Sequence, residues 1–296
     1  MNMGRKEEEK KEQEEEEEEE DSGVVKLKPL FRFECDITDQ RYVSCMDWNT
    51  ANPDLLAVSY GEPEPDSQKQ GILAFWTLKN PSFPEKIFYT TNCLTCCEFS
   101  KRNPNLIAAG DTQGNISIFD IKRGGDKPII TSRHSSGKHT DTVWEVRWVD
   151  RGEKGEVLVS ISADGQVIEW SMRKGLEYNT LMTLKAHTSA KAGAANGNKE
   201  GMIFIHTSGL SIDFPANDIS TYYAATEDCM VHRCGVSYNE QYLNSHYGHS
   251  GPVYRVRCNP FMPSVFATCS YDWTIKIWQL REEDPLNSCT PQDLTQ

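Results

Sequence analysis

The chain has 296 residues, of which 38% are hydrophobic, so it is long and apolar enough to bury a sizeable core. Its formal net charge of −13 at pH 7 argues against a nucleic-acid-binding role, because phosphates attract basic surfaces. No stretch is long and apolar enough to span a bilayer, and the first residues lack the apolar core of a signal peptide. We therefore expect no membrane association and a reducing compartment, in which the ten cysteines are thiols.

Acidic residues are concentrated at the start of the chain. Residues 5–21 contain 12 Asp or Glu and 4 Lys or Arg, including the run from Glu14 to Glu20. Such a run stays solvated, so residues 1–30 are predicted to form an acidic disordered leader. An acidic tail that docks on a basic partner is the alternative. Residues 31–37 then alternate apolar and polar side chains, which predicts a half-buried strand.

One pattern then recurs five times: an apolar strand, a second apolar strand, a turn and a third strand that closes on a large side chain. The closing residues are separated by 43, 51, 64 and 44 positions, and the shortest two spacings match a period of about 40–45 residues. The five closing residues are Trp76, Phe119, Trp170, Cys234 and Trp278. The three inner strands of the first copy are expected at 43–48, 55–58 and 72–76, and those of the second at 94–99, 106–109 and 111–119. In the third copy they are expected at 143–148, around Ser160 and up to Trp170. In the fourth they are expected at 210–214, 222–225 and 228–234, and in the fifth at 253–258, 265–267 and 275–278.

The third and fifth copies are similar to complete WD repeats. By this resemblance, each holds a chain of hydrogen bonds in which a carboxylate binds an imidazole, the imidazole binds a hydroxyl and the hydroxyl binds the closing indole. A hydrolase triad is the alternative for such residues, but the spacing to the closing Trp belongs to the repeat. The two predicted structural tetrads are His139, Ser160, Asp164 and Trp170, and His249, Thr268, Asp272 and Trp278.

The repeats predict an all-β fold, a WD40 β-propeller over residues 31–280. About five blades are countable where a ring has roughly seven, so we expect an incomplete propeller, whether a fragment, a splice form or an incomplete gene model. Outer strands are expected at 85–89, 128–131, 180–184 and 241–245. A small, polar segment at 186–207 predicts a flexible insert, and residues 281–296 are expected to be a polar tail without a strand.

No cofactor or metal site is predicted. Cys93, Cys96 and Cys97 have the spacing of half a zinc site, but no second pair of ligands follows. No Gly-rich phosphate-binding loop occurs either. We therefore expect core or surface thiols and no catalytic residues.

Several phrases resemble the axonemal dynein intermediate chains: residues 52–58, 78–85, 136–139, 158–165 and 237–243. The likeness covers residues 31–280, and the phrases at 173–176 and 237–243 look closest to the intermediate chain of the two-headed inner arm, dynein f. The resemblance implies a non-catalytic subunit of the ciliary or flagellar axoneme, within the cytoskeleton and cytoplasm. Its implied partners are a dynein heavy-chain tail and other intermediate chains. Light chains bind a long N-terminal region of the family, and here about thirty mostly acidic residues stand in its place, so the resemblance does not extend to light chains.

Three alternatives remain. The phrase at 78–85 is shared with the outer-arm intermediate chain, and the repeats alone equally fit a generic WD scaffold such as a ubiquitin-ligase substrate receptor. A propeller enzyme would need inward-facing carboxylates or metal ligands, whereas the expected inner strands supply mainly apolar residues.

For partner binding, the residues before the turn Asp and at the start of the inner strand are candidates, because they often face outward in WD propellers. These are Tyr271 and Pro252 in the fifth copy, and Ala163 and Thr142 in the third.

Overall fold

The structure is a computed structural model that describes residues 29–61, 70–135, 137–152, 155–172, 175–186, 206–280 and 284–290. The acidic leader 1–30, the insert 186–207 and the tail 281–296 therefore lie wholly or largely outside the described residues. The chain divides into two units, Met1–Phe33 and Glu34–Gln296. In the first, the rings of Phe31 and Phe33 meet edge to face at 5.3 Å. All strands described below lie in the second.

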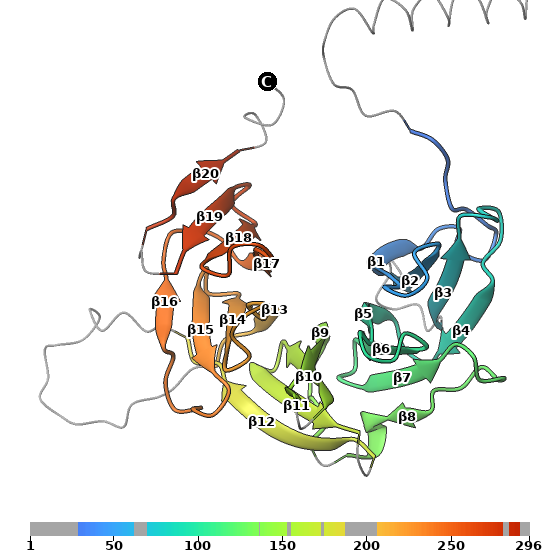
Figure 1. Cartoon of the computed structure of the whole chain (residues 1–296), viewed down its shortest axis with the longest axis horizontal. Helices are drawn as coiled ribbons and strands as arrows, with labels where there is room; N and C mark the ends of the chain where they lie inside the picture. Colours follow the sequence, from blue (N-terminus) through green and yellow to red (C-terminus); the bar gives the residue numbers. More distant parts are fainter. Residues whose placement is uncertain are drawn as a thin grey trace, which may run out of the picture. The chain divides into compact units, whose positions relative to one another are not determined.

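The described residues form five four-stranded antiparallel sheets in which the strands follow one another in chain order (Figure 1). The predicted all-β WD propeller is thus confirmed as an incomplete β-propeller with five described blades. The first two blades are β1–β4 (Tyr42–Trp48, Leu55–Gly61, Gly71–Thr77, Lys86–Thr90) and β5–β8 (Leu94–Phe99, Leu106–Asp111, Ile116–Asp120, Ile130–Thr131). The third is β9–β12 (Val143–Asp150, Glu156–Ser162, Gln166–Ser171, Glu177–Thr183). The fourth and fifth are β13–β16 (Gly209–Asp213, Thr221–Thr226, Val231–Gly235, Asn244–His246) and β17–β20 (Val253–Cys258, Val265–Ser270, Ile275–Gln279, Asn287–Cys289). A 3-10 turn, η1 (Ser132–His134), follows β8.

The core lies between blades. Each inner strand packs against the inner strand of the next blade, β1 on β5, β5 on β9, β9 on β13 and β13 on β17. Phe75 of the first blade meets Phe99 of the second, and Tyr223 of the fourth meets Phe266 of the fifth with ring centroids 4.4 Å apart. Because a blade buries its faces on its neighbours, each repeat requires the next for stability.

Two sequence-based expectations at the ends of the propeller are wrong. Residues 31–35 have no regular structure and 36–40 form a turn, so the strand expected at 31–37 is absent. A strand needs an open edge to pair with, and alternation alone does not supply one. Conversely, the fifth blade has an outer strand, β20, which pairs with β19 although its residues are polar. Its bonds join backbone groups, as Leu286 N donates to Ile277 O at 2.7 Å, so no apolar pattern announces it.

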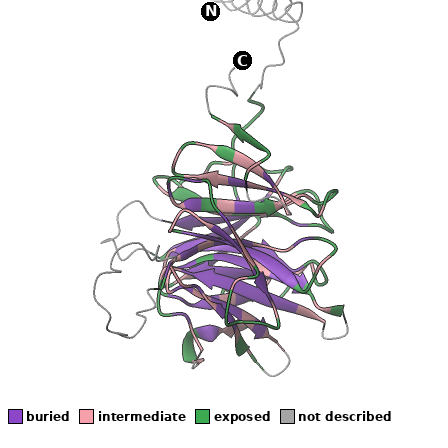
Figure 2. Cartoon of the chain, turned by 90° about the vertical axis from the view of Figure 1, so that its left-hand side faces the viewer, coloured by how far each residue is buried: buried purple, intermediate pink, exposed green. Residues whose placement is uncertain are grey.

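The first and fifth blades leave apolar side chains uncovered. Strand β1 exposes Tyr42, Val43, Met46 and Trp48, with Met46 61% exposed. In Figure 2 the strands towards the C-terminal label are coloured mostly intermediate or exposed, in contrast to the buried strands of the blades below them. These faces are candidates for covering by further protein.

Candidate interaction surface

Both tetrads are assembled by the strand register. In the third blade, His139 Nδ1 lies 3.1 Å from an Asp164 carboxylate oxygen and its Nε2 lies 2.7 Å from Ser160 Oγ, which also accepts from Trp170 Nε1 at 2.8 Å. In the fifth blade, His249 Nδ1 lies 2.9 Å from an Asp272 carboxylate oxygen and its Nε2 lies 2.7 Å from Thr268 Oγ1. Trp278 Nε1 donates to the same Thr268 Oγ1 at 2.8 Å. The hydroxyl stands on the middle strand directly beside the inner strand, and the Asp sits in the turn that follows.

Burial favours a neutral imidazole in the fifth tetrad. Burial lowers the pKa of His249, and the carboxylate of Asp272 only partly opposes this. Burial alone would raise the pKa of Asp272, but hydrogen bonds from Thr274, His249 and the Ser250 amide together hold it well below its ordinary value. A neutral His249 therefore donates through Nδ1 to Asp272 and accepts at Nε2 from Thr268. The Thr268 hydroxyl donates to His249 and accepts from Trp278, and Thr268 is only 2% exposed, so a substrate would not reach it as a nucleophile.

The other blades replace the tetrad with local substitutes. In the first, Trp76 Nε1 donates to the Tyr60 hydroxyl at 3.0 Å. In the second, the closing residue is Phe119, which has no polar group, and Asp111 instead binds Asn92 and Asn115. Both copies keep a buried closing side chain and lack the His, and the second also lacks the closing indole, which is why their repeat signal is weaker.

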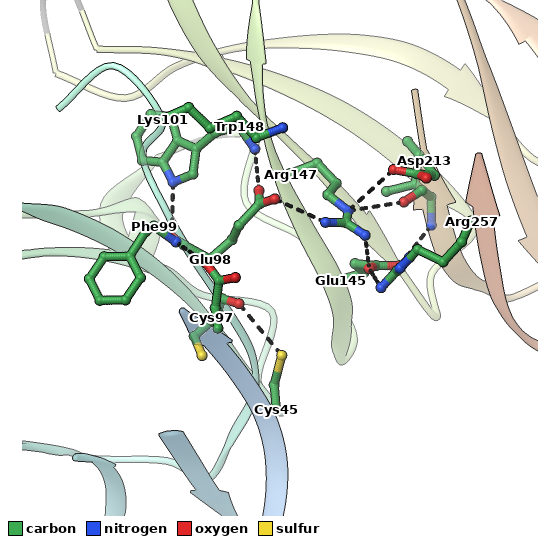
Figure 3. Close-up of polar contacts among 12 residues, drawn as sticks. Cys45, Cys97, Glu98, Phe99, Lys101, Glu145, Arg147, Trp148, Asp213 and Arg257 are labelled. Atoms are coloured by element: carbon green, nitrogen blue, oxygen red, sulfur yellow. Dashed lines mark hydrogen bonds and ion pairs between the residues drawn. The ribbon is translucent and has the colours of Figure 1, made fainter. Parts of the chain in front are cut away.

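A second set of polar contacts joins the inner strands to one another. A carboxylate on each accepts a backbone N–H from the next: Asp47 from Phe99, Glu98 from Trp148, Glu145 from Ile212 and Asp213 from Cys258. Figure 3 shows Glu98, Glu145 and Asp213 around Arg147, with Arg257 beside Glu145. We call the carboxylates Asp47, Glu98, Glu145 and Asp213, together with Arg147, Arg255 and Arg257, the inner-strand belt. The inner strands are mainly apolar, as expected, but they also carry these carboxylates, because alternate residues of the strands face the neighbouring inner strands rather than a blade face.

Glu145 is the centre of the belt. Its Oε1 lies 3.2 Å from Arg147, 3.1 Å from Arg255 and 2.8 Å from Arg257, and its Oε2 accepts from Ser211 and Ile212. Burial would raise the pKa of Glu145, but the three guanidinium groups hold it below its usual range. Burial dominates at Glu98 and raises its pKa to about 7 against the opposing effect of Arg147. Since every carboxylate of the belt is bound to a cation or an amide, the belt serves structure rather than acid–base chemistry.

The cysteines expected to be thiols are free throughout the described residues. Cys96 and Cys97 are buried on β5, and burial raises the pKa of Cys96. Within the described part of the chain, no group of three or more His, Cys, Asp or Glu is arranged to hold a metal ion. The same residues contain no helix with the length and apolarity to cross a membrane.

The candidate partner-binding residues lie at one end of the sheets, where the inner strands begin and the second strand turns into the third. We call this the leading end. Tyr271 N donates to Pro252 O in the fifth blade, and Ala163 N donates to Thr142 O in the third, both at 2.9 Å. Tyr271 is 64% exposed, whereas Pro252, Thr142 and Ala163 are only partly so. Of the four, Tyr271 offers the largest free side chain.

Residues 240–279, which contain the fifth blade, match the family model for the WD domain, G-beta repeat. Over 275 residues the chain is 42% identical to dynein axonemal intermediate chain 4 of Mus musculus, covering 90% of this chain and 34% of that protein. The protein of that name from Xenopus laevis is 43% identical over 263 residues, 86% of this chain and 35% of its own. The chain is a homologue of the axonemal dynein intermediate chains.

The family resemblance predicted from the sequence phrases is thereby confirmed. Dynein axonemal intermediate chain 1 of Bos taurus also matches, at 34% identity over 264 residues, covering 88% of this chain and 37% of that protein. This intermediate-chain homologue spans about a third of the length of these relatives. The tetrads, the belt and the leading end all fall within a WD-repeat unit related to dynein subunits.

Proposed function

We propose that this chain is a non-catalytic WD-repeat subunit of an axonemal dynein complex, which binds a dynein heavy-chain tail and supports assembly and regulation of ciliary motility. The observation that carries the proposal is the similarity over nine tenths of the chain to proteins named as axonemal dynein intermediate chains. The partners are a heavy chain and other intermediate chains, and the location is the cilium or flagellum axoneme. The polar side chains brought together in the tetrads and the belt are bound to one another, which supports a binding role over catalysis.

We assign the chain to the inner arm rather than the outer arm on the phrases at 173–176 and 237–243. The uncovered apolar side chains of β1 and the exposed Tyr271 are the surfaces offered to partners. Tyr271, Pro252, Thr142 and Ala163 remain the proposed contact residues at the leading end. Aromatic side chains contribute strongly to interfaces, so Tyr271 is expected to contribute most of the four.

The test is affinity purification of the tagged full chain from ciliated cells, followed by identification of the proteins that copurify. Axonemal heavy chains and a second intermediate chain are expected, and inner-arm heavy chains would separate the inner-arm assignment from the outer-arm alternative. Recovery of ubiquitin-ligase subunits without any dynein heavy chain would overturn the proposal in favour of a generic scaffold. A Tyr271→Ala chain that recovers heavy chain undiminished would remove Tyr271 from the interface without affecting the rest.

A further inference from the structure

The fifth blade carries three exposed aromatic rings at the leading end. Tyr254, Tyr271 and Trp273 are 50%, 64% and 77% exposed. The rings of Tyr254 and Tyr271 meet edge to face, with centroids 6.4 Å apart at 82°. Trp273 follows two residues later in the same turn between β18 and β19. Single exposed aromatics are ordinary, but a group on one turn and its neighbouring strand forms a surface.

The backbone of Trp273 supports a role beyond folding. Its φ of 63° lies in the left-handed region, which disfavours bulky side chains by about 1 kcal/mol. At the matching turn of the third blade, the residue after the tetrad Asp is Gly165, with φ 78°. Packing does not offset this cost at Trp273, because its side chain is largely in water. A large ring kept in a position suited to glycine points to a contact outside the fold.

A pocket adjoins these rings. It has a volume of about 310 Å³ and is lined by residues from all five inner strands, among them Tyr42, Trp144, Tyr254 and Arg255. Tyr254 belongs both to the pocket and to the aromatic pair with Tyr271, so pocket and turn form one continuous aromatic surface. The only cation named in this lining, Arg255, is held 3.1 Å from Glu145 in the belt. The surface therefore offers ring faces and hydroxyls rather than a free positive charge.

The loops of the leading end are acidic. The described loop residues at 36–41, 91–93, 111–115, 132–135, 137–142, 163–165, 184–186, 206–208, 227–230, 247–252 and 271–274 hold eight Asp or Glu, against the four cations Arg41, Arg133, Lys138 and Lys185. Five of these carboxylates are exposed or partly exposed, namely Asp36, Asp39, Asp141, Glu227 and Asp228. The other three, Asp111, Asp164 and Asp272, have little exposure, and hydrogen bonds lower the pKa of Asp164 and Asp272 against the effect of burial. A surface with aromatic faces and a negative rim complements a cation, since ammonium and guanidinium groups are attracted to both.

We propose that the leading end binds a linear, Lys- or Arg-rich segment of a partner protein, with its basic side chains over Tyr271, Trp273 and the pocket bounded by Tyr254. The segment is identified by its chemistry and does not depend on the chain being a dynein subunit. An acidic segment would be repelled by the rim. A neutral Pro-rich segment would use the rings but not the charges.

The test is fluorescence anisotropy of labelled peptides with the purified full chain. The probes are a short Arg-rich peptide, the same peptide with Glu replacing each Arg, and a neutral Pro-rich peptide. We expect only the Arg-rich peptide to bind, and Trp273→Gly and Tyr254→Ala each to weaken it about three- to tenfold. Glycine suits the backbone at position 273, so that variant removes the ring without threatening the fold. Circular dichroism melts verify that both variants are folded.

The matched control is Phe261→Ala, which removes a 91% exposed ring from the turn between β17 and β18, at the opposite end of the same sheet. It should leave the affinity unchanged. Equal affinity of the parent, Trp273→Gly and Tyr254→Ala would overturn the proposal, since it would show attraction to the overall charge of −13 alone. Tighter binding of the Glu-rich or the Pro-rich peptide would overturn it as well. Absence of heavy chain from purified complexes would affect only the dynein assignment and not this result.

Discussion

Replacing Asp272 by Ala tests whether the fifth tetrad stabilises its blade. The carboxylate accepts from His249 Nδ1 at 2.9 Å, from the Ser250 and Thr274 amides at 3.0 Å and from Thr274 Oγ1 at 2.6 Å. Truncation leaves the His249 ring, which is 9% exposed, with Thr274 Oγ1 at 3.3 Å as its nearest remaining partner on that side. Stranding a buried donor costs about 1–3 kcal/mol. The free energy of unfolding should fall by that amount.

Urea melts of the parent and Asp272→Ala measure this difference. Asp272→Asn is the graded variant, because its amide oxygen can still accept from His249, and it should lose less stability than Asp272→Ala. Glu177→Ala, which removes an exposed carboxylate from β12, is the control and should change stability by no more than about 0.5 kcal/mol. An Asp272→Ala protein with the parent's urea midpoint and slope would refute the argument that the chain of hydrogen bonds contributes to stability.

Three further outcomes are expected. The pKa values of Asp164 and Asp272 are lower in the folded chain than their ordinary 3.8, so the unfolded chain takes up protons at these groups first on acidification, and the advantage of the parent over Asp272→Ala in thermal melts should be constant above about pH 5 and shrink below pH 4. Glu145→Ala should cost about 3 kcal/mol in urea melts, since it leaves the buried Arg147 and two partly exposed arginines without their shared carboxylate; a loss below 1 kcal/mol would contradict this. Because the apolar side chains of β1 and of the fifth blade are uncovered, light scattering should find the full chain oligomeric, and a stable monomer would show that these faces need no covering.

The blades could be predicted because their signals are local. The inner triplets expected at 94–99 and 106–109 correspond to β5 and the start of β6, since runs of buried apolar residues between turns specify strands directly. In the sequence, the closing Trp170 follows His139 and Asp164, and the closing Trp278 follows His249 and Asp272, at the spacing of the repeat. This spacing is why the tetrad residues could be named. The bounds of the outer strands are harder to predict. An outer strand is expected at 241–245, whereas β16 is Asn244–His246. Outer strands are short and half-exposed, so their sequence pattern is weak.

The inner-strand belt could not be predicted in the same way. In isolation, Glu98 or Glu145 looks like the solvated side of a strand, and only the neighbouring blade shows that each is buried beside an arginine. One signal could have found part of it. Asp47, Glu98 and Asp213 each directly precede the aromatic residue at the end of an inner strand, namely Trp48, Phe99 and Phe214. A carboxylate recurring at one position of a repeat indicates a repeated partner.

The third and fifth blades lack a carboxylate at this repeat position, and their residues there connect the belt to the leading end. The matching inner-strand position, four residues after Val143 and Val253, holds Arg147 in the third blade and Arg257 in the fifth, where the first, second and fourth blades have carboxylates. The reversed charges converge on Glu145, so Arg257 of β17 reaches past β13 to a carboxylate of β9. Arg255 binds the same oxygen, which ties two positions of β17 to one point. Since Tyr254 directly precedes Arg255 on that strand, the belt fixes the strand that carries the aromatic surface. The geometry of the proposed binding face therefore depends in part on one buried carboxylate, that of Glu145.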